Sequence, residues 1–302
     1  MTISVYIPLL LSLVLAALSR PLARWLSPRT AAPALVIAAG LSAAASTWGL
    51  ILLAATLLHE VPPITERAVT GTHLPHEPVP GLIAAAAGAV LAVGAYRLTE
   101  VIKGRRATHR TLRGLCEPSE AAELVVIAAS APHAVAVPGR GGNHGRILVT
   151  SGMLAALDHD ERAVLLAHER AHLRERHHWL RAVVDAAAAV NPLLRPARDT
   201  VAFLLERCAD EAAADTVGSR TLAARSLARA ALATTDATRG EALAFQRLAI
   251  TTRVAALQVA APPPRPLIAA AVVLIGVLTT LLAGDATVAF VELVERFLPG
   301  GS

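Results

Sequence analysis

Charged and aromatic residues are scarce in this chain of 302 residues. Only 17% of the residues are charged and 3% are aromatic, whereas 54% are apolar. A soluble globular domain carries about 25% charged residues, and so the composition argues against an ordinary soluble protein of this length. It favours an integral membrane protein, and the abundance of alanine favours helices.

Cysteine and acidic residues are also few. The two cysteines, Cys116 and Cys208, lack the CxxC spacing and cannot form a disulfide framework, so we expect free thiols in a reducing compartment. Lysine and arginine outnumber acidic residues by 28 to 23, but they gather at the ends of apolar runs. With so few aromatic residues beside them, we expect no nucleic-acid partner.

Four apolar runs are long enough to cross a bilayer. They cover about residues 3–19, 33–58, 81–102 and 267–283. The predicted fold is mainly α and integral to the membrane, with four transmembrane helices and an α+β zincin-like metallopeptidase domain carrying a small sheet.

The charges between the runs predict the orientation. Basic residues follow the first run (Arg20, Arg24, Arg29) and the third run, whereas acidic residues dominate after the second and fourth. The positive-inside rule then places a domain of residues 104–265 in the cytoplasm and both termini outside. Residues 1–103 form a membrane region with three helices, and residues 266–302 form the fourth helix and a short extracytoplasmic tail. We expect a multi-pass protein of the cell (inner or plasma) membrane.

The motif that carries chemistry is His-Glu-x-x-His at residues 168–172. At 3.6 residues per turn, His168 and His172 share one helix face and can bind one zinc ion. Glu169 can take a proton from zinc-bound water. Upstream, Asp158 and Glu161 have the spacing of a capping box that begins this helix.

A third ligand is predicted downstream, in the segment Glu-Arg-Cys-Ala-Asp. Glu206 and Asp210 are spaced i, i+4, so they share a face of a second helix. Glu206 can complete a His, His, Glu site for one Zn²⁺ per chain, and Asp210 can accept the free N–H of a zinc histidine. Cys208 points to another face and is predicted to be a packed core thiol.

A rival third ligand is His178, which has the spacing of the metzincin pattern. That pattern needs Gly at position 175, where this chain has Glu. Residues 173–176 are good helix formers, so we expect the helix to continue and to turn His178 away from His172. His177 and His178 are therefore predicted to be surface or interface residues.

Short strands are predicted at residues 123–129, 134–137 and 146–150, the last two joined as a hairpin through a glycine-rich turn. The turn lacks Gly-Lys-Ser/Thr, which excludes a phosphate-binding loop. Residues 133–137 are our candidate for a strand edge that holds an extended peptide beside the metal. Residues 179–194 are too short for a span and are predicted to form a re-entrant or interfacial helix.

HERAH followed by ERCAD, together with the membrane runs, resembles the BlaR/MecR type of membrane metallopeptidase, a relative of the HtpX and CAAX-prenyl-protease group. The resemblance implies that His168, His172 and Glu206 bind zinc, that Glu169 is catalytic and that Asp210 supports the site. It also implies a cytoplasmic transcriptional repressor as the substrate.

The predicted function is a membrane-embedded zinc endopeptidase that cuts a cytoplasmic or membrane-proximal protein. Its partners are a protein or peptide substrate and the lipid bilayer, and the sequence leaves the oligomeric state open. The alternative is a catalytically silent membrane receptor or scaffold that keeps the zinc-binding fold. A transporter is disfavoured because the apolar runs lack central charges. The only tyrosines are Tyr6 and Tyr96, so we expect a histidine (His133 or His177) or an arginine to take the place of the usual tyrosine that stabilises the oxyanion.

Overall fold

The computed structural model describes residues 7–56, 81–116, 122–139, 145–237, 242–260 and 263–297. The α-helices in chain order are α1 (Ile7–Trp25), α2 (Pro28–Ala55), α4 (Gly81–Cys116), α5 (Ser151–Ala156), α6 (His159–Arg174), α7 (His177–Val190), α8 (Arg195–Val217), α9 (Arg220–Ala237), α10 (Ala242–Gln258) and α11 (Pro266–Phe297). A 3-10 helix, η3 (Pro192–Leu194), separates α7 from α8. The strands are β1 (Leu124–Ile127), β2 (Ala134–Val137) and β3 (Arg146–Thr150). The predicted fold class, mainly helical with a small sheet, is confirmed.

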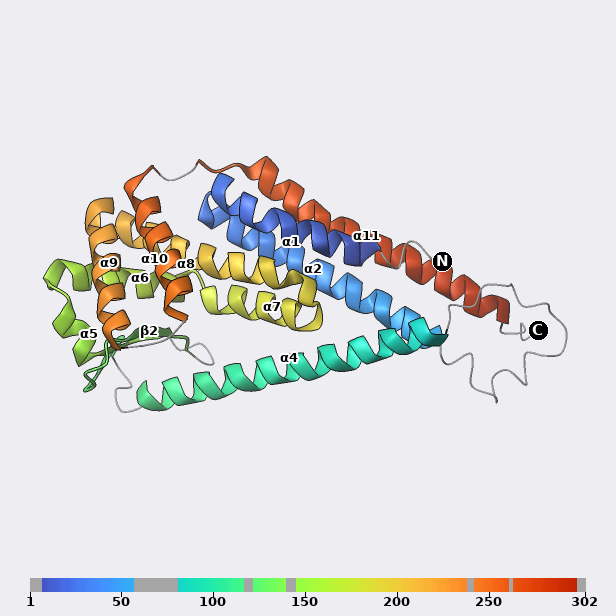
Figure 1. The fold of residues 1–302 in the computed structure, drawn as a ribbon, viewed down its shortest axis with the longest axis horizontal. Coiled ribbons are helices and arrows are strands. Elements are labelled where there is room, and N and C mark those ends of the chain that lie inside the picture. Colours follow the sequence, from blue (N-terminus) through green and yellow to red (C-terminus); the bar gives the residue numbers. More distant parts are fainter. Residues whose placement is uncertain are drawn as a thin grey trace.

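Two regions make up the elongated molecule shown in Figure 1. Long helices α1, α2, α4 and α11 form a bundle, and the sheet with α5, α6, α9 and α10 lies beyond one end of it. The first turn of α1 and the C-terminal half of α11 lie at the opposite end of the bundle. At the sheet end, Arg29 at the start of α2 pairs with Asp215 near the end of α8 at 3.0 Å.

Four helices are long and apolar enough to cross a membrane: α1, α2, α4 and the first 20 residues of α11. They contain the described parts of the four predicted runs; residues 3–6 and 57–58 of those runs lie outside the described residues. Three of the helices extend well beyond the predicted apolar ends, α1 to Trp25, α4 to Cys116 and α11 to Phe297. Charged residues that leave the bilayer, such as those following residue 102, are themselves good helix formers. The loss of hydropathy therefore does not end the helix.

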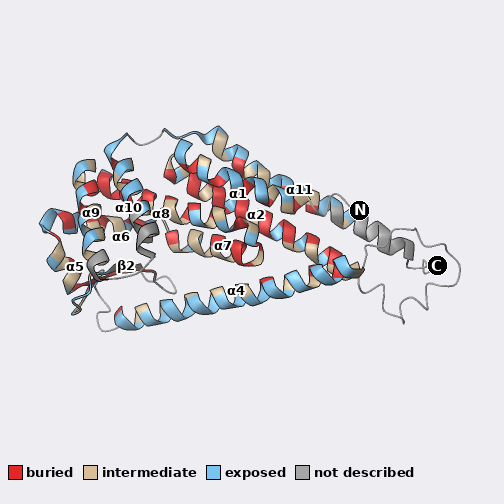
Figure 2. Cartoon of the chain, in the orientation of Figure 1, coloured by how far each residue is buried: buried red, intermediate tan, exposed pale blue. Residues whose placement is uncertain are grey.

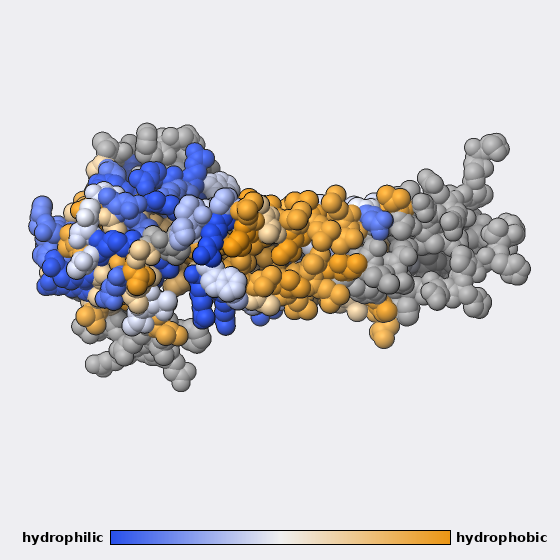
Figure 3. Space-filling model, turned by 90° about the horizontal axis from the view of Figure 1, so that it is seen from above, coloured by the Kyte–Doolittle hydropathy of each residue, from blue (hydrophilic) through white to orange (hydrophobic). Residues whose placement is uncertain are grey.

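The face of the bundle seen in Figure 3 is a continuous apolar band, coloured orange, which ends where the hydrophilic sheet region begins. Large side chains such as Leu82 (82% exposed) and Leu267 (84% exposed) point outward from it. Figure 2 shows that α4 is exposed along most of its length, while α1 and α2 carry a buried core. An apolar surface of this extent is what the interior of a bilayer covers.

Helix α7, η3 and α8 form a helical hairpin that enters this bundle, in keeping with the short helix predicted at residues 179–194. Helix α7 packs against α2 and α4. At the tip, the buried Asn191 donates from Nδ2 to the hydroxyls of Ser12 and Ser46, at 3.0 Å each. Its Oδ1 accepts from the backbone N–H of Leu193 at 3.1 Å. One amide thus fixes the hairpin to α1 and α2.

The sheet has the strand order β1-β3-β2, with β1 parallel and β2 antiparallel to β3. The predicted hairpin of β2 and β3 is confirmed, although most of its glycine-rich turn (140–144) lies outside the described residues. Ile147 and Val149 are fully buried against α5 and α6. Among the described strands, β2 is an edge strand, and it lies beside α6.

The turn after α6 differs from the prediction. Helix α6 begins with the expected capping box. The side chain of Asp158 accepts from the backbone N–H of Glu161 at 2.9 Å, and the side chain of Glu161 accepts from the backbone N–H of Asp158 at 3.0 Å. However, α6 ends at Arg174. Arg176 adopts a left-handed conformation with φ of 53°, which a continuing α-helix does not allow. The chain reverses there, and α7 begins at once with His177.

Candidate metal centre

Helices α6 and α8 pack together and bring three candidate ligands to one point. The contact is made by small side chains, Ala171 on α6 and Ala209 and Ala212 on α8, all buried. Because these alanines let the two helix backbones approach closely, Glu206 on α8 reaches the histidines on α6. The ligand atoms of His168, His172 and Glu206 all lie within 4.8 Å of one another.

The spacing of these atoms fits a tetrahedral metal ion. The Nε2 atoms of His168 and His172 are 3.1 Å apart, and each lies 3.6 Å from an oxygen of Glu206. Ligands at about 2.1 Å from a tetrahedral zinc ion are about 3.4 Å from each other. Two imidazoles and a carboxylate are also the donor set that zinc takes in open, three-ligand sites. The residues present therefore fit a zinc ion, with a fourth position left for water or substrate.

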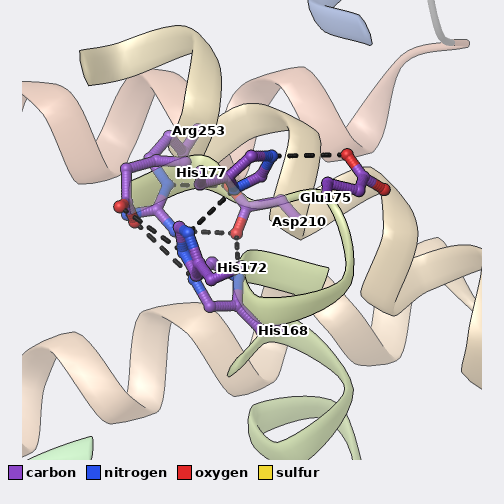
Figure 4. Close-up of polar contacts among 7 residues, drawn as sticks. His168, His172, Glu175, His177, Asp210 and Arg253 are labelled. Atoms are coloured by element: carbon purple, nitrogen blue, oxygen red, sulfur yellow. Dashed lines mark hydrogen bonds and ion pairs between the residues drawn. The ribbon is translucent and has the colours of Figure 1, made fainter. Parts of the chain in front are cut away.

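Asp210 supports His168, in the place expected from the sequence. Its Oδ1 lies 3.1 Å from Nδ1 of His168, and its side chain is 4% exposed. An acceptor there keeps the proton of His168 on Nδ1 and leaves Nε2 free to face a metal. Figure 4 shows this carboxylate between His168 and the guanidinium of Arg253.

Arg253 on α10 is a site residue that the sequence reasoning missed. It donates two hydrogen bonds of 2.7 Å to Asp210 and approaches Glu206 to 3.0 Å. Helix α10 lies far along the chain from both motifs, and a single arginine in a helix carries no spacing signal. Only the packing of α10 beside α8 brings it into the centre.

The charges of the centre balance one another. Burial by itself disfavours charge, yet hydrogen bonds to Asp210 and Glu206 raise the pKa of His168 to about 10. Burial likewise opposes ionisation of Glu206, but His168 and Arg253 hold its pKa below the usual range. Burial and the neighbouring cations lower the pKa of His172 to about 4, despite the opposing charge of Glu206. Without a metal His172 is thus neutral at pH 7, whereas His168 carries a second proton, which a metal ion must displace from Nε2.

Glu169 lies against the edge strand. Its side chain is buried, and the backbone N–H of Ala136 on β2 is one of the groups that favour its ionised form. Burial raises the pKa of Glu169, which the charge of His168 opposes. A raised pKa makes the carboxylate a better proton acceptor at neutral pH.

His177 also belongs to the centre, and the prediction that it lies on the surface is wrong. It is 4% exposed, and its Nδ1 lies 2.8 Å from Nδ1 of His172. Its Nε2 lies 3.3 Å from the carboxylate of Glu175. Because α6 ends at Arg174 rather than continuing, residue 177 folds back onto the face that holds His172. His178 is not among the candidate metal ligands of the described residues.

Glu175, His177 and Cys208 form a second cluster of atoms close enough to hold a metal ion. One arrangement of protons satisfies His177 without a metal: it accepts from His172 and donates to Glu175. The Cys208 thiol is buried, as predicted, and burial raises its pKa to about 12. Without a metal, this cluster is therefore a hydrogen-bond chain behind His172.

Two hollows flank the centre, and both are lined by Ala134, His168, Glu169 and Glu206. The distal hollow, about 430 Å³, extends between α9 and α10. The proximal hollow, about 360 Å³, extends along α7 and α8. His168, Glu169 and Glu206 thus lie between the two hollows.

A helix with two histidines and an adjacent glutamate, met by a glutamate from a second helix, is the arrangement of a zinc peptidase. Residues 105–196 match Peptidase family M48. The M48 match includes β1, β2, β3 and the His168–His172 motif, and it ends before Glu206 and Asp210. Family M48 covers zinc metallopeptidases of the HtpX and CAAX-protease type, and residues 105–196 of this chain are similar to them. The match does not single out the BlaR/MecR type. Neither the curated proteins nor the solved structures contain a significant match to the chain.

Proposed function

We propose that this protein is a membrane zinc endopeptidase whose metal is held by His168, His172 and Glu206, one ion per chain. The observation that carries the proposal is the mutual spacing of the three ligand atoms, 3.1 to 3.6 Å. The match to Peptidase family M48, which includes helix α6 with His168 and His172, supports the proposal. The substrate is a protein or peptide.

The residues divide the work of peptide hydrolysis. A zinc ion bound there would acidify a water molecule and polarise the scissile carbonyl. Glu169 takes the proton of the attacking water and delivers it to the leaving amine. Asp210 and the His177–Glu175 pair hold the two histidines in the required tautomers, and Arg253 keeps Asp210 and Glu206 ionised.

We further propose that the peptidase domain faces the cytoplasm and that both termini lie outside. The basic residues at the end of α1 and the start of α2, and those in the C-terminal half of α4, lie at the sheet end of the bundle. The start of α1 lies at the other end. This arrangement agrees with the positive-inside rule for a cell-membrane protein.

The test uses the full-length protein in lipid nanodiscs, with β-casein as an unfolded substrate. The wild type should contain one zinc per chain and cut β-casein. Glu169→Gln should keep the zinc and lose activity by roughly 10²- to 10⁴-fold. Glu206→Gln should lose the zinc, whereas Asp199→Asn, an exposed carboxylate on the same helix, should lose neither. A wild type without zinc, or equal cleavage by Glu169→Gln, would contradict the proposal.

A further inference from the structure

A second group of metal-ligand atoms lies on the Nδ1 side of the His172 ring. It consists of a carboxylate oxygen of Glu175, a ring nitrogen of His177 and the thiol of Cys208, and these atoms all lie within 4.8 Å of one another. The nitrogen is Nε2, because Nδ1 of His177 faces Nδ1 of His172 at 2.8 Å, whereas Nε2 lies 3.3 Å from Glu175. Figure 4 shows His177 between His172 and Glu175. We call these three residues the rear cluster.

One unusual turn holds the rear cluster together. Glu175 ends α6, His177 begins α7, and Arg176 between them has φ of 53°. Among the described residues, only Arg176 combines a side chain with a positive φ, and such strain persists only where the surrounding structure imposes it. Cys208 approaches from α8, two residues beyond Glu206. Three packed helices, rather than a loose loop, therefore fix the positions of the ligand atoms.

The donor set suits a divalent ion such as Zn²⁺ or Co²⁺. Thiolate, imidazole and carboxylate are the three side-chain groups that bind zinc in proteins. Ligand atoms of one tetrahedral zinc ion lie about 3.5 Å apart, so the rear cluster must contract by roughly 1 Å. The side chain of Glu175, which is 27% exposed, is free to make this movement. A bound metal ion deprotonates a coordinating thiol outright, so the thiolate and the carboxylate together balance the charge of the ion.

We infer that the rear cluster is a second, regulatory metal site, and that an ion bound there weakens zinc binding at the first site. Without a metal, His177 accepts at Nδ1 from His172 and donates from Nε2 to Glu175. An ion on Nε2 displaces the hydrogen from that nitrogen. A neutral His177 then carries its hydrogen on Nδ1, and it donates to His172 where it previously accepted.

The exchange of roles reaches the first site through the His172 ring. When Nδ1 of His172 accepts, a neutral ring must carry its hydrogen on Nε2, the nitrogen that lies 3.1 Å from Nε2 of His168. A nitrogen that carries a hydrogen cannot bind zinc. The only proton released to solvent is that of the Cys208 thiol, because each histidine loses one ring hydrogen and gains another. The two sites thus oppose each other, and this coupling is reciprocal.

The first experiment titrates the metal-free full-length protein in nanodiscs with Co²⁺. A thiolate bound to Co²⁺ gives a charge-transfer band in the near ultraviolet, whereas His168, His172 and Glu206 provide no sulfur. The wild type should bind a second ion that produces this band. Cys208→Ala should lose the band, and Glu175→Gln should shift it to higher Co²⁺ concentration. Cys116→Ala, which removes the other buried thiol, should leave it unchanged.

The first Co²⁺ equivalent also verifies that each variant is folded, because it reports on the site that the substitutions leave intact. No band in the wild type, or a band that persists in Cys208→Ala, would overturn the second site. Uptake of a single ion that itself gives the band would contradict the proposed function rather than the rear cluster.

The second experiment measures the coupling between the sites. Glu206→Gln lacks the first site, so its His172 ring is free to exchange its hydrogen. The thiolate band should therefore appear at roughly 10- to 100-fold lower Co²⁺ than in the wild type, the size of effect typical of a partner of a metal histidine. Asp199→Asn, an exposed carboxylate on the same helix, should titrate like the wild type. Equal midpoints for the wild type and Glu206→Gln would refute the coupling.

The third experiment tests the regulatory role, which rests on the proposed function, whereas the metal site itself does not. Excess Zn²⁺ should inhibit the cleavage of β-casein by the wild type and should not inhibit Cys208→Ala. Inhibition of equal strength in Cys208→Ala would show that excess zinc acts elsewhere and would overturn the regulatory role. Absence of Glu169-dependent cleavage at any zinc concentration would instead overturn the proposed function.

Discussion

The Nδ1 atoms of His172 and His177 lie 2.8 Å apart, and the far nitrogen of His177 meets Glu175. His168 has an equivalent neighbour in Asp210. Each candidate zinc histidine is therefore held by its own hydrogen-bonded partner, and the two partners come from different parts of the fold. Figure 4 shows both arrangements in one view.

Replacing His177 should weaken metal binding without removing a ligand. His177→Ala deprives His172 of its acceptor and should lower zinc affinity about 10- to 100-fold. His177→Asn restores an acceptor near the position of Nδ1 and should recover part of the loss. Competition with a chromophoric chelator measures the affinity, with His178→Ala as the neighbouring control. Equal affinities for wild type and His177→Ala would show that the contact has no role in metal binding.

Arg253 should matter for stability as well as for the site. It is the cation that pairs with Asp210, and the two side chains are 12% and 4% exposed. Arg253→Ala leaves a buried carboxylate without its partner, which should cost about 3–5 kcal/mol. Arg253→Lys keeps the charge but loses the paired hydrogen bonds, so its stability should lie between those of the wild type and Arg253→Ala.

The measurement for Arg253 is chemical unfolding of the zinc-loaded protein in nanodiscs. Arg198→Ala is the control, because Arg198 pairs only with its neighbour Asp199 among the described contacts and both are exposed. It should change stability by less than about 0.5 kcal/mol. A similar small change for Arg253→Ala would refute the structural role assigned to the pair.

Asn191 should stabilise the helical hairpin inside the bundle. Asn191→Ala removes its hydrogen bonds to Ser12 and Ser46 and should cost about 1–2 kcal/mol, a value typical of polar contacts between membrane helices. Ser42 is the matched control, since its hydroxyl is buried in the same bundle without a partner among the described residues. Ser42→Ala should be neutral or stabilising. Thermal unfolding in one detergent compares the two, and a larger loss for Ser42→Ala would contradict this account.

The capping box of α6 should make stability depend on acid. The hydrogen bond from the backbone of Glu161 lowers the pKa of Asp158 in the folded state. A lowered pKa means that the contribution is fully present above the ordinary value for Asp and is lost as the pH falls through the lowered value. Asp158→Ser keeps a capping oxygen but does not titrate.

As the pH falls from about 5 to about 3, the thermal midpoint of the wild type should therefore decrease more than that of Asp158→Ser. At neutral pH, Asp158→Ala should lower the midpoint relative to both, because the first turn of α6 loses its cap. A pH-independent difference between wild type and Asp158→Ser would rule out the carboxylate as the titrating group.

The sequence by itself determined the features that depend on neighbouring residues. Helical periodicity alone places His168 and His172 on one face, and the capping box at Asp158 follows from local hydrogen bonding. Long apolar runs likewise locate the membrane helices, because bilayer thickness sets their length. The candidate third ligand, Glu206, could be predicted from the sequence because its i, i+4 partner, Asp210, marks the same helix face.

Only the tertiary structure decided the rest of the centre. Arg253 enters it through the packing of α10, and His177 enters it because the chain turns at Arg176 instead of continuing as a helix. The residues around Arg176 favour helix, and so local propensity gave the wrong answer for His177. Contacts between distant helices depend on which alanine faces pack together, and an alanine-rich sequence offers many such faces of nearly equal hydrophobicity.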